Sequence, residues 1–75
     1  MLIMAQDKKR MVDCKIVEVT RNIGGGKEAK YVLTASTSGF GAMIIGAYPD
    51  EESAMAELEK IYTAFESGAK TYRVE

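Results

Sequence analysis

Several residue types that commonly carry out chemistry are missing or nearly missing from this chain. Among its 75 residues there is no histidine, no tryptophan and a single cysteine, Cys14. A lone cysteine cannot form an intrachain disulfide, and without histidine or a second cysteine the chain has no typical zinc ligand set. Histidine is also the commonest general acid or base at neutral pH. We therefore expect no metal, no cofactor, no disulfide scaffold and no enzymatic activity.

The groups that remain for catalysis have simpler structural interpretations. Cys14 stands in an apolar strand pattern, where we expect a buried thiol rather than an activated nucleophile. Five glutamates follow one another along an expected helix, on the side that the pattern assigns to solvent: Glu51, Glu52, Glu57, Glu59 and Glu66. Their expected role is to keep that helix face hydrated.

Strong charge and long apolar runs are also missing. The formal net charge is -1, which argues against binding along a nucleic-acid backbone, since that needs a basic face. The apolar start ends at Gln6 and is too short for the core of a signal peptide. No stretch approaches the roughly 20 apolar residues of a transmembrane helix. We expect a cytoplasmic protein with neither a nucleic-acid nor a membrane partner.

The length leaves room for one domain, residues 1–75. A chain of this size buries only about 60% of its unfolded surface, so its stability is marginal without extra support. Disulfides and metals are excluded above, and association between copies remains. The expected state is a homo-oligomer, a dimer or a tetramer.

Alternation of apolar and polar residues predicts strands, separated by polar or glycine-rich turns. The expected strands are 1–6, 11–21, 30–35, 42–48 and 70–75. The alternation in 11–21 changes phase after Ile16, which indicates a β-bulge near Ile16 and Val17 or a strand covered on both faces. The stretch 42–48 is almost wholly apolar, which favours a central position in the sheet.

A single amphipathic helix is predicted between the last two strands. Asp50 is the expected N-cap and Gly68 the expected residue that ends the helix. An apolar stripe follows the helical repeat at Ala54, Leu58, Ile61, Tyr62 and Phe65. The predicted fold is α+β: an antiparallel sheet of four to five strands in the order β-β-β-β-α-β, with this helix packed on it.

Two loops carry the candidate binding groups. The sequence Gly24-Gly25-Gly26-Lys27 resembles a phosphate loop only superficially, because Glu28 stands where Ser or Thr is required and a strand follows. It is interpreted either as a plain hairpin or as a loop that closes over a ligand. The turn 36–41 offers hydroxyl groups and a phenyl ring, or else is a polar turn whose Phe40 packs at a subunit interface.

A binding site built from these loops would use three kinds of contact. Basic residues would hold phosphates, hydroxyl groups would donate hydrogen bonds and aromatic rings would stack on a base. The candidates for these three roles, in that order, are Arg21, Lys27 and Lys30; Ser36, Thr37 and Ser38; and Phe40 and Tyr48. Tyr48 is chosen because a ring at the strand–helix junction is expected to be exposed, and Tyr62 is left out because it lies on the buried stripe. Glu51 and Glu52 already occupy the positive end of the helix, so no anion is expected there.

Four segments together resemble a group of small proteins of Firmicutes and their phages. They are Ile-Gly-Ala-Tyr-Pro-Asp-Glu-Glu-Ser-Ala at 45–54, Leu-Glu-Lys-Ile at 58–61, Ser-Gly-Ala-Lys-Thr-Tyr at 67–72 and the opening Ile-Met-Ala-Gln-Asp at 3–7. Some phage proteins of this size and class are anti-defence sponges, oligomers that bind the cyclic nucleotides of CBASS immunity or the cyclic ADP-ribose signals of Thoeris. The resemblance implies a viral immune-evasion protein in the host bacterial cytoplasm. It assigns no site residues.

Three functions follow from these observations. The first is a sponge that sequesters a cyclic nucleotide signal, such as a cyclic dinucleotide, without cleaving it. The second is a protein–protein inhibitor of a host defence enzyme, comparable to an anti-CRISPR protein, which would use the acidic helix face. The third is an accessory phage protein with no small ligand.

Overall fold

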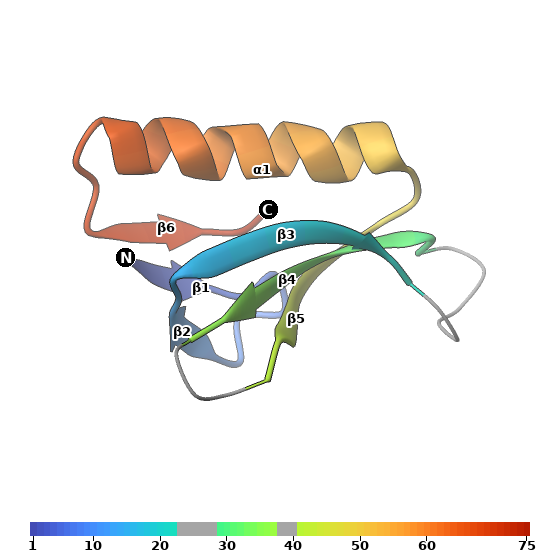
Figure 1. Ribbon diagram of the computed structural model, residues 1–75, viewed down its shortest axis with the longest axis horizontal. Helices are drawn as coiled ribbons and strands as arrows, with labels where there is room; N and C mark the ends of the chain where they lie inside the picture. Colours follow the sequence, from blue (N-terminus) through green and yellow to red (C-terminus); the bar gives the residue numbers. More distant parts are fainter. Residues whose placement is uncertain (23–28, 38–40) are drawn as a thin grey trace.

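The computed structural model describes residues 1–22, 29–37 and 41–75, and they form two small sheets and one helix (Figure 1). The elements are β1 (Leu2–Met4), β2 (Met11–Asp13), β3 (Ile16–Arg21), β4 (Tyr31–Ser36), β5 (Met43–Tyr48), α1 (Glu51–Glu66) and β6 (Thr71–Arg73). The sheets have the strand orders β2-β1-β6 and β3-β4-β5. The α+β class is confirmed. The prediction of one sheet was wrong.

The smaller sheet joins the two ends of the chain. β1 pairs antiparallel with β2, where Ile3 lies opposite Val12, and parallel with β6, where Ile3 lies opposite Tyr72. Parallel neighbours need a long crossover, and here almost the entire chain provides it. The expected all-antiparallel pairing therefore fails at β6, while β3, β4 and β5 pair antiparallel as predicted.

The phase change in 11–21 marks the point where the chain passes from one sheet to the other. Cys14 and Lys15 separate β2 from β3, so the expected single strand is two. Val12 is buried in the first sheet, whereas Ile16 is exposed in the second. The pairing of β3 with β4 runs through Ile16 and Val17 without a register shift. The register shift lies between β4 and β5: Leu33 faces Gly46 while Thr34 faces Ile44, which leaves Ile45 without a partner in β4.

β5 is an edge strand, not the central one, since β4 lies in the middle of its sheet. Gln6 nevertheless covers much of the free side of β5. Its backbone N–H donates to the carbonyl of Ile45 at 2.7 Å, and its side-chain oxygen accepts from the N–H of Ala47 at 2.9 Å. This bridge joins the two sheets and pairs part of the edge of β5, although Met43 and Ile44 remain exposed.

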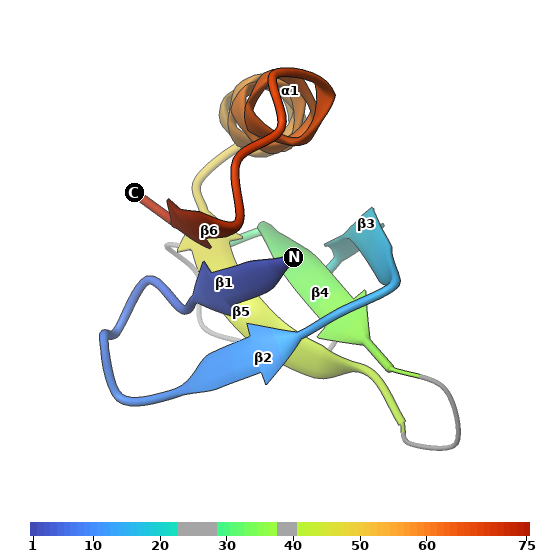
Figure 2. The ribbon, with the colours of Figure 1, turned by 90° about the vertical axis from the view of Figure 1, so that its left-hand side faces the viewer.

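The core lies where the two sheets meet beneath the helix (Figure 2). Ile3, Leu33 and Ile45 are its largest fully buried side chains, one from each of β1, β4 and β5. α1 contributes Ala54 and Ile61. Gly46 is required at its position because a Cβ there would stand 2.8 Å from the hydroxyl oxygen of Tyr48.

Both predicted ends of α1 are confirmed. The carboxylate of Asp50 accepts from the N–H of Ser53 at 2.7 Å, as an N-cap should. Gly68 takes a positive φ of 87°, and its N–H donates to the carbonyl of Phe65 at 3.0 Å. This left-handed residue turns the chain back beneath the helix toward β6.

Candidate functional site

The structure divides the candidate residues chosen from the sequence. Arg21 and Tyr48 both lie opposite Tyr31, at the end of the sheet where Lys30 precedes β4. Ser36 and Thr37 lie at the other end of β4. Five residue steps of about 3.4 Å put these two ends roughly 17 Å apart. Within one chain they do not form a single site. The remaining candidates, Lys27, Ser38 and Phe40, lie outside the described residues.

Tyr48 is buried and cannot stack on a base, so this prediction was wrong. Its ring is 8% exposed, and its hydroxyl donates to the carbonyl oxygen of Glu75 at 2.9 Å. Burial, together with the negative charges of Glu57 and Glu75, raises the pKa of Tyr48 to about 12. Its role is to attach the C-terminal residues to β5.

Glu57 is buried as well, although the sequence assigned it to the solvated side of the helix. The side chain is 4% exposed, and its Oε2 accepts from the Tyr72 hydroxyl at 2.7 Å and from the N–H of Glu75 at 3.1 Å. Burial and the hydrogen bond to Glu57 raise the pKa of the Tyr72 hydroxyl. The segment after α1 runs back beneath this flank of the helix and covers it (Figure 1).

This buried polar cluster is fully occupied by its own members. Among the described residues, every buried side-chain nitrogen or oxygen has a hydrogen-bond partner. The cluster therefore offers no unpaired buried polar group to a ligand, and its role is to stabilise the fold.

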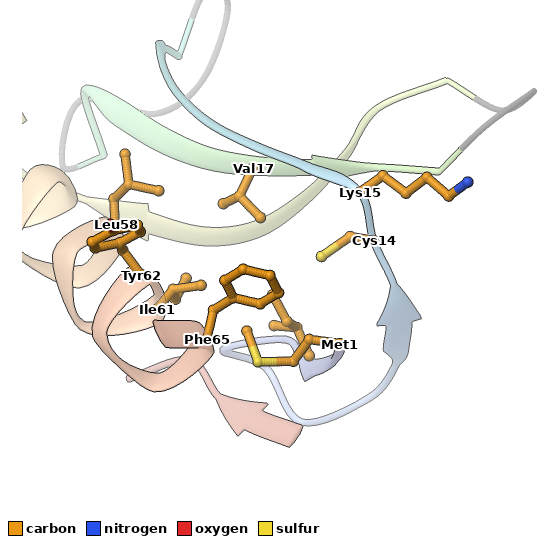
Figure 3. Close-up of a pocket in the computed structure, with 9 residues that line it drawn as sticks. Met1, Cys14, Lys15, Val17, Leu58, Ile61, Tyr62 and Phe65 are labelled. Atoms are coloured by element: carbon orange, nitrogen blue, oxygen red, sulfur yellow. The ribbon is translucent and has the colours of Figure 1, made fainter. Parts of the chain in front are cut away.

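An open groove of about 250 Å³ lies on the opposite flank of the helix, between α1 and the chain that links β2 to β3 (Figure 3). Its surface is mostly carbon, and the polar atoms of its side chains belong to one amine, one thiol and one phenol. The lining residues are Met1, Ile3, Cys14, Lys15, Val17, Leu58, Ile61, Tyr62 and Phe65. It is larger than a second hollow, of about 200 Å³, that lies between Gln6 and β5.

Two aromatic side chains of the groove are unusually exposed. Tyr62 is 55% and Phe65 64% exposed, although the sequence placed both on the buried stripe. Phe65 does lie on the inner side of α1, with its ring directed toward Val17, Cys14 and Met1 in Figure 3. It stays exposed because, in the part of the chain that the structure describes, no further side chain covers it. The reason for excluding Tyr62 was therefore wrong.

The remaining polar groups at the groove are Cys14 and Lys15. Burial raises the pKa of the Cys14 thiol, and the nearby N-terminal ammonium offsets only part of this effect. The thiol is therefore protonated at neutral pH and is not an activated nucleophile. The stem of Lys15 lines the groove, and its ammonium extends outward, away from the aromatic rings (Figure 3).

Sequence reasoning missed this groove because its walls come from three separated segments. The only local signal was the pair Tyr62 and Phe65, spaced three apart near the end of the stripe and just before the glycine that ends the helix. Their partners, Cys14 and Val17, read as ordinary strand residues.

The described residues contain no group of three or more acidic, cysteine or histidine side chains placed to hold a metal ion. Their one helix is too short and too polar to cross a membrane. Comparison of the chain with protein-family models, with curated proteins and with solved structures found no match.

Proposed function

We propose that this protein captures a cyclic nucleotide in the groove beside α1 and sequesters it without cleaving it. The observation that carries this proposal is the pair of half-exposed aromatic rings, Tyr62 and Phe65, that line a carbon-rich groove. Exposed aromatic rings are suited to stacking on a nucleobase, which is worth about 1–3 kcal/mol per base. The resemblance to phage anti-defence sponges leads to the same ligand class.

Capture without turnover is favoured because the described lining of the groove carries no group suited to general base catalysis. Its described lining residues carry no carboxylate and no imidazole, and the Cys14 thiol has a raised pKa. A nucleotide held there would meet no general base that works near neutral pH. Lys15 is the one cationic side chain among the described lining residues, and it suits a phosphate at the outer rim.

The proposal is tested by thermal unfolding against a panel of cyclic dinucleotides, cyclic trinucleotides and cyclic ADP-ribose isomers. A ligand at a thousand times its Kd adds about 4 kcal/mol to the free energy of unfolding, which shifts the midpoint strongly for so small a domain. The bound compound should be recovered intact after denaturation. If no member of the panel shifts the midpoint, the proposal fails.

Aromatic truncation locates the binding site. Phe65→Ala and Tyr62→Ala should each weaken binding about ten-fold, because each removes one stacking surface. Ile44→Ala is the matched control, since Ile44 is equally exposed but lies on β5 and does not line the groove. Equal losses in all three variants would contradict the assignment of the site.

A second function, inhibition of a host protein, is favoured by the acidic outer face of α1. Glu52, Glu59 and Glu66 are all exposed there, and they recur at helical spacing on one side. Glu52→Lys combined with Glu59→Lys should abolish binding of a basic partner. Glu57 is left out of this test because it is buried, and changing it would damage the fold. An accessory role with no small ligand remains if neither kind of binding is found.

A further inference from the structure

The strand edges of this molecule are unequally protected. The outer side of β5 is covered by Gln6, and the outer strands of the other sheet, β2 and β6, are only three residues long. β3 differs, because its six residues pair with β4 on one side and with none of the other described strands on the other. In Figure 2 it forms the free margin of its sheet. An edge strand of this length is a template for pairing with another chain.

The backbone groups open to such pairing can be identified from the register. Asn22 donates its N–H to the carbonyl of Lys30 at 2.8 Å, so these two form a hydrogen-bonded pair. Hydrogen-bonded and non-bonded pairs alternate along an antiparallel ladder. The even-numbered residues of β3 therefore bond to β4, and the odd-numbered residues Val17, Val19 and Arg21 direct their backbone groups outward. Between the described elements, no turn, loop or cap hydrogen bond uses those outward groups.

An antiparallel copy of β3 fits this edge in one register better than in the others. When Val19 faces Val19 of the second copy, Val17 faces Arg21, and all three open residues of each strand are paired. Sliding one strand by two residues in one direction, the smallest slip that keeps the outward backbone groups facing each other, places Glu18 directly opposite Glu18 of the second copy, which is destabilising. The shift in the other direction leaves Val17 without a partner. Self-complementarity of this kind is the requirement for a two-fold dimer.

We infer that two copies of this chain pair through β3 in the register that centres on Val19, and that each groove is completed by Arg21 of the second copy. Val17 lines the groove, and Arg21 of the second copy lies directly opposite it on the same face of the joined sheet. The guanidinium group thereby reaches the open side of the groove. Arg21 lies far from the Ser36 end of its own sheet, but in the dimer it lies beside the groove of the neighbouring copy.

The flank of α1 that faces β3 agrees with this arrangement. Tyr62 lines the groove next to Val17, and Met55 lies two helical turns before it on the same side of the helix. Both are about half exposed in the single chain. Across the joined sheet two helices centred on β4 would stand roughly 14 Å apart, three strand spacings of about 4.8 Å. Directly packed helices are about 8–10 Å apart, so a channel remains between them.

The composition of that channel indicates which cyclic nucleotide it would bind, and this step rests on the proposed function. Aromatic rings would line it from both helices, and two arginines related by the two-fold axis would face it. A guanidinium group is suited to bidentate contact with phosphate. The ligand that fits is a two-fold symmetric cyclic dinucleotide, with one base at each pair of rings and one phosphate at each arginine.

Disulfide trapping tests the dimer by itself, without any nucleotide. In the inferred register Glu18 faces Thr20 of the second copy in a non-bonded pair, where the Cα atoms are about 4.5 Å apart and within disulfide range. Glu18→Cys and Thr20→Cys are made separately in a Cys14→Ser background, one of them carrying a mass tag. On mild oxidation of the mixture we expect disulfides that join one chain of each kind. Disulfides between identical chains in preference to mixed ones, or no disulfides with a monomer in analytical ultracentrifugation, would overturn the inference.

The arginine is tested separately with a cyclic dinucleotide found in the unfolding panel. Arg21→Gln should weaken its binding by about ten-fold or more, since a charge-assisted hydrogen bond is lost, while dimerisation persists. Arg73→Gln is the control, because Arg73 is an exposed arginine on β6 in the other sheet. Unchanged affinity in Arg21→Gln overturns the role of Arg21. Mixed disulfides combined with no response to any nucleotide would instead leave the dimer standing and refute the proposed function.

Discussion

At the scale of single residues, the side chains that the sequence described least well are those that tie the C-terminal segment to the helix. Glu57 accepts two hydrogen bonds, from Tyr72 and from the N–H of Glu75, and Tyr48 donates to the Glu75 carbonyl. Lys60 lies 3.9 Å from Glu57 and 3.6 Å from Glu75. A buried carboxylate is tolerated here because donors surround it.

Truncating that carboxylate should be costly. Glu57→Ala leaves the Tyr72 hydroxyl and the Glu75 N–H without an acceptor, and each buried unsatisfied donor costs about 1–3 kcal/mol. We expect urea unfolding to show a loss of about 2–4 kcal/mol, whereas Glu59→Ala on the exposed face should stay within about 0.5 kcal/mol. Similar values for the two variants would show that the buried cluster does not stabilise the fold.

The pH dependence of stability should reveal the raised pKa of the Tyr48 hydroxyl. Its pKa is raised to about 12 in the folded state, from 10.0 in the unfolded chain. The folded state therefore holds the proton more tightly, so this contribution to stability is complete below pH 10 and is lost as the pH rises from 10 to 12. The midpoint of thermal unfolding should fall across that window, and it should fall less steeply in Tyr48→Phe. Parallel curves for the two proteins would contradict this assignment.

At the scale of elements, two glycines set how α1 and β5 fit the rest of the chain. Gly68 turns the chain with a positive φ at the end of the helix, and Gly46 leaves room for the Tyr48 ring and for Val74. Both glycines thereby position β6 and the residues after it. The role of Gly68 follows from the sequence pattern, but the role of Gly46 depends on the side chains that pack against it.

Alanine substitutions compare the stability contributions of Gly46 and Gly68 with that of a glycine that has no special role. Gly46→Ala should cost about 1–3 kcal/mol because its Cβ would overlap the buried Tyr48 side chain, and Gly68→Ala should cost about 1 kcal/mol because of its backbone angle. Gly41→Ala is the control, since nothing lies within 4 Å of its added Cβ. Denaturant midpoints measure all three, and a Gly41 variant as unstable as the Gly46 variant would refute the packing argument.

At the scale of the whole molecule, a large share of the apolar surface is left uncovered in a single chain. The large side chains that are exposed come from five strands or helices in both halves of the fold: Leu2, Met11, Ile16, Met43, Ile44, Met55, Tyr62 and Phe65. Exposed apolar groups mark an interaction surface where they lie together, as Tyr62 and Phe65 do at the groove. They agree with the argument from chain length that association supplies part of the stability.

Association should appear as a dependence of stability on protein concentration. If the folded state is a dimer, raising the concentration a hundred-fold should raise the midpoint of thermal unfolding by several degrees, through mass action. Calorimetry over a range of concentrations checks this. Identical midpoints at all concentrations would show that the single chain is the stable unit.

The sequence by itself determined the features that depend on neighbours along the chain. The N-cap at Asp50, the end of the helix at Gly68, the three antiparallel strands and the terminal strand all follow from local periodicity and backbone preference. So does the α+β class.

Only the tertiary structure decided which faces are covered. The pairing of β6 with β1 buries Glu57 and Tyr48, the bridge from Gln6 covers β5, and the break at Cys14 divides the strands between two sheets. The same tertiary arrangement forms the groove in which Tyr62 and Phe65 stay exposed. The physical reason is that burial depends on segments distant in the chain, and a periodic pattern in one segment does not state what will pack against it.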